Sequence, residues 1–258
     1  MDSSGNPALR EETFASLSVA AIEKRMTVAG SAAKTLLFLV LVFVGGAWGW
    51  ASATTPVATD LGEGYANTTV TIPGGFWLAS FGALLVGIFC AMNPRSAALL
   101  GAIYAVLQGF CLGAISAAFD AQTEGIVGAA ILATLAVFVV ALFLYVTRII
   151  RPTRKMAFGV AAGIGGLALL YFFVFVLSIF DWSWLYSDSF QTIGFIVSLA
   201  AVVLAALSLT LDFAVIERGA AAGAPKYMEW YSAYGLMVTI IWLYITLLRI
   251  LAFLARNR

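Results

Sequence analysis

The side chains with the clearest chemical potential are polar residues inside long apolar stretches. Asp212 lies in the stretch 209–216, about one helical turn before its end, and Ser208 precedes it by four residues and shares its helix face. A carboxylate at this depth can be neutralised by a proton, a cation or an arginine, and competition among these is how a pH-sensitive gate works. The alternative is a snorkelling or locally hydrogen-bonded carboxylate, and composition leaves both interpretations open.

Other polar residues accompany Asp212 within the apolar stretches or at their ends, and we treat them as accessory positions. Gln108 lies midway along one stretch, Glu217 is expected at an interface, and Arg249 is too far from Asp212 to pair with it unless the last segment folds back. Two further candidates, Asn93 and Arg95, close the end of another stretch.

The composition of the 258 residues excludes a water-soluble enzyme. Hydrophobic residues make up 62% and charged residues 10% of the chain, with a mean hydropathy of +1.00, whereas a soluble domain has about 45–50% apolar and ~25% charged residues. The absence of histidine excludes histidine metal sites and Ser-His-Asp triads. With two cysteines we expect no disulfide framework, and with a net charge of +1 we expect no nucleic-acid partner. We also expect no tightly bound metal or cofactor and no enzyme activity.

The chain is expected to be an all-α polytopic membrane protein. A membrane-spanning helix needs about 20 mostly apolar residues, and seven stretches qualify. This gives a cytoplasmic tail over 1–34, a seven-helix transmembrane domain over 35–254 and a short tail over 255–258. The predicted spans are 35–52, 75–92, 97–118, 125–146, 156–179, 192–216 and 228–254.

Lysine and arginine occur only in alternate loops, which predicts the orientation. The three intervening loops contain neither residue, so the positive-inside rule places the N-terminus in the cytoplasm of a cell whose cytoplasmic membrane holds the protein. Seven spans then place the C-terminus outside, where Arg249, Arg256 and Arg258 disagree with the rule. Either the tail is too short to matter, or the seventh segment is unusual, for example re-entrant.

The predicted outer loops carry acids and no basic residue. They can focus cations at an outer mouth; alternatively, topology excludes lysine and arginine and the acids are incidental. These acids are Asp60, Glu63, Asp120, Glu124, Asp181 and Asp188.

Two glycine patterns predict close helix packing, since small residues spaced four apart let helices approach in lipid. One is Gly109 with Gly113, and the other is Gly159 with Gly163, extended by residues 165 and 166.

Two motifs mark the last two spans: the end of the sixth span carries Asp212 and an isoleucine four residues later, and the last span closes on a Leu-Leu-Arg-Ile run. Further stretches accompany them along the chain, so that the full set is 26–28, 93–94, 104–109, 112–116, 211–219 and 241–251. Taken in this order, these stretches resemble the bacterial branch of the Bax inhibitor-1 family. The similarity covers most of the chain from Met26 onward.

The resemblance implies a seven-helix bundle with the last helix central and a pH-sensitive calcium leak, with a pair of aspartates near the cytoplasmic side as sensor. The first aspartate corresponds to Asp212 and the second to Thr239, where this chain departs from the family pattern. Gln108 stands where many relatives are expected to have glutamate. Two close carboxylates share a proton, which one carboxylate beside a threonine cannot do, although Thr239 can hydrogen-bond to Asp212. The alternative is a non-transporting regulator of stress or cell-death responses that acts through membrane-protein partners.

Overall fold

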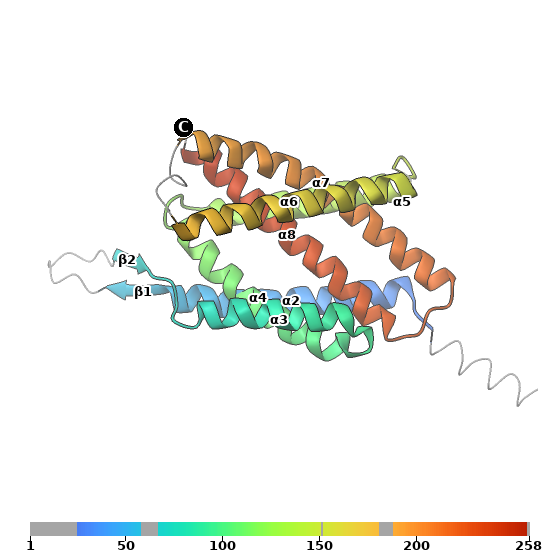
Figure 1. Cartoon of the computed structure of the whole chain (residues 1–258). Helices are drawn as coiled ribbons and strands as arrows, with labels where there is room; N and C mark the ends of the chain where they lie inside the picture. Colours follow the sequence, from blue (N-terminus) through green and yellow to red (C-terminus); the bar gives the residue numbers. More distant parts are fainter. Residues whose placement is uncertain (1–24, 58–66, 151, 181–187, 257–258) are drawn as a thin grey trace, which may run out of the picture.

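Seven long helices make up most of the described structure (Figure 1). The computed structural model describes residues 25–57, 67–150, 152–180 and 188–256. In Figure 1 successive helices run back and forth between the two ends of the bundle. The helices are α2 (Val28–Ala53), α3 (Phe76–Met92), α4 (Ala97–Asp120), α5 (Ile126–Val146), α6 (Arg154–Phe180), α7 (Asp188–Ala221) and α8 (Met228–Arg256).

The predicted helical membrane architecture is confirmed at the level of length and composition. Within the described residues, six helices are long and apolar enough to cross a membrane. The remaining one, α3, is equally apolar but has 17 residues, at the lower limit of the ~17–25 residues that span a bilayer. All seven predicted apolar stretches therefore form helices.

The first helix begins earlier than predicted, at Val28 instead of residue 35. Thr27 is its N-cap: the hydroxyl of Thr27 accepts a hydrogen bond from the backbone N–H of Gly30 at 2.9 Å, which satisfies one of the free donors of the first turn. Lys34, expected at the end of a polar tail, consequently lies inside the helix. The hydropathy pattern missed this because the first two turns of α2 consist mostly of small residues and include Ser31 and Lys34.

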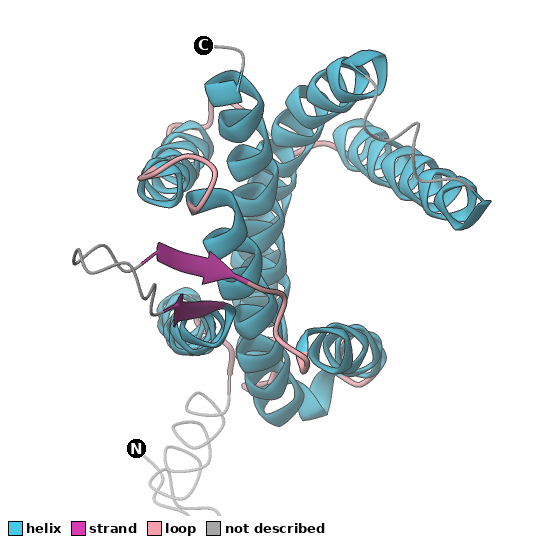
Figure 2. Ribbon diagram, turned by 90° about the vertical axis from the view of Figure 1, so that its left-hand side faces the viewer, coloured by secondary structure: helices cyan, strands magenta, loops and turns pink. Residues whose placement is uncertain are grey.

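A small antiparallel hairpin was not predicted. Strand β1 (Thr54–Val57) continues directly from α2 and pairs with β2 (Asn67–Val70), with Thr54 opposite Val70. Figure 2 shows both strands in magenta at one end of the bundle. Threonine and valine are branched at Cβ and favour extended backbone, so this segment leaves the helical path. A single 3-10 turn, Pro94–Ser96, links α3 to α4.

Helices α4 and α8 are the most buried of the candidate spans. In each of them 44% of the most apolar stretch is buried, against 6% in α6. Helix α8 packs against α7, α2, α5 and α4, and α4 packs against α2, α3, α8 and α5. Helix α6 packs mainly against α7 and exposes most of its side chains.

Glycines bring α2 and α4 into backbone contact. A Cβ atom added at Gly109 or Gly113 would overlap the backbone of Val42 or Gly46, respectively, on α2. The packing role predicted for this pair is therefore confirmed. The role predicted for the glycines of α6 is wrong in three of four positions: only Gly163 has a neighbour, the side chain of Leu204, and the other three meet nothing within 4 Å.

These glycines give a matched test of the packing. Gly113→Ala should lower stability by about 1–3 kcal/mol because a Cβ there forces α2 and α4 apart. Gly165→Ala, in open space on α6, should be neutral or stabilising, since alanine favours helix by up to ~1 kcal/mol. Thermal unfolding of both variants in the same detergent measures the difference. Equal melting temperatures would contradict the assigned contact.

Candidate functional site

Asp212 and Thr239 meet where α7 packs on α8. The hydroxyl of Thr239 donates a hydrogen bond to Asp212 Oδ2 at 2.7 Å and lies 3.3 Å from the carbonyl oxygen of Gly235 in the preceding turn of α8. Both side chains are half-buried. The two positions that the resemblance pairs are thus direct neighbours, with a hydroxyl in place of the second carboxylate.

Asp212 has no cationic partner in the described part of the chain, where the one ion pair joins Lys34 to Glu229. One turn earlier on α7, Ser208 is 8% exposed, and its hydroxyl is the only buried side-chain oxygen or nitrogen of the described residues without a hydrogen bond. A carboxylate with one protein hydrogen bond and a nearby unpaired hydroxyl leave oxygen atoms that a proton, a water molecule or a cation can use.

A second carboxylate, Glu229 in the first turn of α8, was missed by the sequence analysis. Glu229 is fully buried and forms an ion pair with Lys34 of α2. Its other oxygen accepts hydrogen bonds from the backbone N–H and the hydroxyl of Thr27, both at 2.9 Å. The ammonium group of Lys34 also lies 5.1 Å from the ring centroid of Trp230, a cation–π distance.

Residues at the start of α2 pack closely around the carboxylate of Glu229. A Cβ atom added at Gly30 would overlap the Glu229 carboxylate, so a larger residue at position 30 would displace this side chain. One residue before Thr27, the N–H of Met26 donates to the carbonyl of Ala224 at 2.7 Å, which ties the start of α2 to the α7–α8 connection. Glu229 therefore has the bonding of a structural ion pair. The sequence feature that could have indicated this pair is two opposite charges near the starts of α2 and α8.

The accessory positions do not gather around Asp212. Glu217 is exposed at the end of α7 and accepts a hydrogen bond from the hydroxyl of Tyr145. Arg249 contacts Tyr171 of α6, with Nη1 3.1 Å from the tyrosine hydroxyl. It therefore lies toward the other end of α8, as predicted.

Three further accessory residues belong to α4 and the turn that precedes it. Gln108 is half-buried within α4. Asn93 is exposed and donates to the carbonyl of Phe89 at 3.1 Å, and Arg95 is exposed in the 3-10 turn. Asn93 acts as a local cap of α3.

Only part of the predicted acidic outer mouth can be placed. Asp120 accepts a hydrogen bond from the N–H of Gly125 at 3.1 Å, within the α4–α5 turn, and Glu124 is exposed in the same turn. Asp188 is the first residue of α7. The acids Asp60, Glu63 and Asp181 lie outside the described residues.

The chain matches a known protein family. The model of a family described as Bax inhibitor 1 like matches residues 6–256, almost the whole chain. The chain belongs to the Bax inhibitor 1 like family. The resemblance read from the sequence is therefore confirmed, and a search of the curated proteins found no match. In this member of the Bax inhibitor 1 like family, the residue expected to be the second aspartate is Thr239, bonded to Asp212.

The Lys34–Glu229 pair predicts an asymmetric response to mutation. Lys34→Met leaves a buried carboxylate unpaired and should destabilise by up to about 3–5 kcal/mol. Adding Glu229→Gln in the same chain should recover most of the loss, because the charge that needed a partner is gone. Lys155→Met, at an exposed lysine of α6, is the control. Thermal unfolding of the four proteins tests this, and a double variant no more stable than Lys34→Met would refute the pairing.

Proposed function

We propose that this Bax inhibitor 1 like protein is a cation leak channel or exchanger of the cytoplasmic membrane, with calcium as the transported ion. The observation that carries the proposal is the contact of Asp212 with Thr239 between α7 and α8. Asp212 combines a negative charge, no cationic partner among the described residues and an unpaired buried hydroxyl one turn away. Ionisable groups inside membrane helices are costly and generally serve ion or proton pathways.

The proposal includes a topology. All seven helices cross the bilayer, with α3 as a short span and α8 as an inner helix. The N-terminus is cytoplasmic because the loops between α3 and α4, α5 and α6, and α7 and α8 carry the basic residues. In this orientation Asp212 is near the cytoplasmic side, and the acidic loops at the other face attract cations.

Cysteine labelling tests this orientation. Gln122 and Thr153 are exposed in loops at opposite ends of the bundle, and the natural Cys90 and Cys111 are buried. We expect a cysteine at position 122 to react with an impermeant reagent added outside intact cells, and one at position 153 to react only after lysis. Labelling of position 153 in intact cells would invert the proposed topology.

The gate is tested by calcium flux into liposomes over a range of pH. Protonation removes the only charge proposed at the gate, so wild-type flux should change with pH and the flux of Asp212→Asn should not. Thr239→Asp should couple two carboxylates and steepen the response. Thr239→Val removes a hydrogen bond to a carboxylate, worth about 1.5–3 kcal/mol, and should shift the profile without abolishing it.

Glu217→Gln is the matched control because Glu217 is on the same helix but exposed; it should retain the wild-type profile. If Asp212→Asn keeps both the wild-type rate and its pH dependence, Asp212 is structural and the gate is refuted. If the purified wild type conducts no cation at any pH, the alternative of a regulator acting through membrane-protein partners is favoured.

A further inference from the structure

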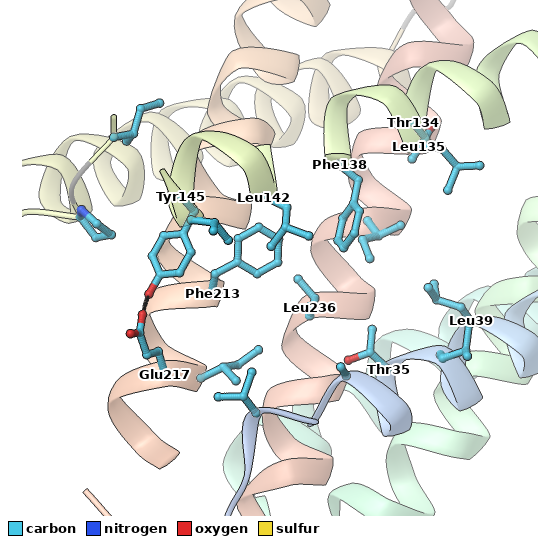
Figure 3. A pocket seen from close by; sticks show the side chains of 18 of the residues that line it. Thr35, Leu39, Thr134, Leu135, Phe138, Leu142, Tyr145, Phe213, Glu217 and Leu236 are labelled. Atoms are coloured by element: carbon cyan, nitrogen blue, oxygen red, sulfur yellow. Dashed lines mark hydrogen bonds between the residues drawn. The ribbon is translucent and has the colours of Figure 1, made fainter. Parts of the chain in front are cut away.

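A groove of about 980 Å³ opens between α2 and α5, with α7 and α8 forming its floor (Figure 3). Its volume is at the upper end of the ~300–1,000 Å³ typical of small-molecule sites. The walls do not close it: α2 packs against α4 and α8, and α5 against α8 and α7. Exposed leucines on both walls, Leu36 and Leu135 among them, leave the groove open sideways, toward the bilayer.

Most of the groove offers no free polar group. Its lining is apolar except for five residues, and two of these, Thr35 and Thr134, donate their hydroxyls to carbonyls of their own helices at 2.9 and 2.7 Å. The remaining three, Tyr145, Arg148 and Glu217, come from the last turn and C-terminal end of α5 and from the end of α7. The groove is therefore amphipathic along its length, with an apolar body and one polar end.

At the polar end the lining carries one acid and one arginine, Glu217 and Arg148. Tyr145 donates its hydroxyl proton to Glu217, which remains negatively charged. The exposed side chain of Arg148 makes no hydrogen bond and no ion pair with any described residue. Arg154 and Lys155 follow at the start of α6, and the segment 152–155 has no acidic residue, so basic side chains outnumber the acid near this end.

The backbone of Arg148 is unusual as well. Arg148 has φ 58°, the only positive φ of a non-glycine residue in the described chain. It follows the end of α5, where glycine is the relaxed choice. A left-handed residue other than glycine costs of order 1–3 kcal/mol and occurs at ligand clamps. The left-handed turn at Arg148 ends α5 and reverses the chain, with the N–H of Ile150 donating to the carbonyl of Leu144 at 3.2 Å.

We propose that this groove binds an anionic phospholipid of the surrounding bilayer, with acyl chains along the apolar lining and the phosphate at Arg148. A lateral opening between exposed apolar helices suits a ligand that arrives through the membrane. Arg148, which has no ion-pair partner among the described residues, together with the basic residues that follow it suits an anionic head group. The lining includes neither Asp212 nor Thr239, and lipid binding does not require ion flux.

Native mass spectrometry of the purified full-length protein tests the site. Phosphatidylglycerol and phosphatidylcholine with identical acyl chains are added in equal amounts. We expect the wild type to retain phosphatidylglycerol about fivefold more strongly, the effect of roughly one basic contact with an anionic lipid. Arg148→Gln should reduce this preference to near unity. Ala32→Trp or Leu142→Trp, which fill the groove from opposite walls, should lower retention of both lipids.

Arg95→Gln, at an exposed arginine outside the groove, is the charge-matched control and should behave as the wild type. Thermal unfolding without added lipid confirms that each variant is folded. The proposal is overturned if Arg148→Gln keeps the preference for phosphatidylglycerol, if Arg95→Gln loses it equally, or if both folded tryptophan variants retain lipid like the wild type. Because flux is not measured, none of these results bears on the calcium gate.

Discussion

Backbone contact between α2 and α4 is the constraint on which the other helix positions depend. Four glycines, two on each helix, face the partner backbone so closely that a Cβ would overlap its atoms: Gly45, Gly49, Gly109 and Gly113. With one face held against α4, α2 presents Lys34 and Phe38 to α8, where they meet Glu229 and Trp230. Lipid supplies no hydrophobic force between helices, so these close contacts and the buried ion pair fix α8, and α8 in turn carries Thr239 to Asp212.

The two carboxylates inside the bundle differ in how completely their charge is satisfied. Glu229 has an ammonium partner and two hydrogen bonds from Thr27, so its environment requires it to remain charged. Asp212 has one hydrogen bond, from a neutral hydroxyl. Removing one partner of a buried ion pair costs about 3–5 kcal/mol. Such a pair therefore holds the two helices that carry it in one relative position. An incompletely satisfied one can exchange partners, and this difference distinguishes the candidate functional acid from the structural one.

The sequence predicted the helices, and residues that are neighbours on one helix, better than it predicted contacts between different helices. Apolar length located all seven helices, and four-residue spacing placed Ser208 beside Asp212. The same four-residue glycine spacing gave a correct contact at Gly113 and none at Gly159, since the pattern does not say whether a partner helix lies opposite. Glu229 was missed for the same reason: read span by span, it and Lys34 are separate charges near membrane interfaces, and only the packed bundle brings them together. Thr239 was found because a family resemblance carries pairwise information that hydropathy lacks.

The floor of the groove lies next to the candidate gate, so a movement of α7 relative to α8 affects both sites. Phe213 and Ile240 line the groove, and each is the chain neighbour of one member of the Asp212–Thr239 contact. Any separation of α7 from α8 that opens that contact must also move the floor of the groove. A lipid that binds one arrangement of this floor more tightly would therefore favour that arrangement of the gate, and by linkage the gate would alter lipid affinity by the same factor. Equal affinity for both arrangements would produce no coupling, however tightly the lipid binds.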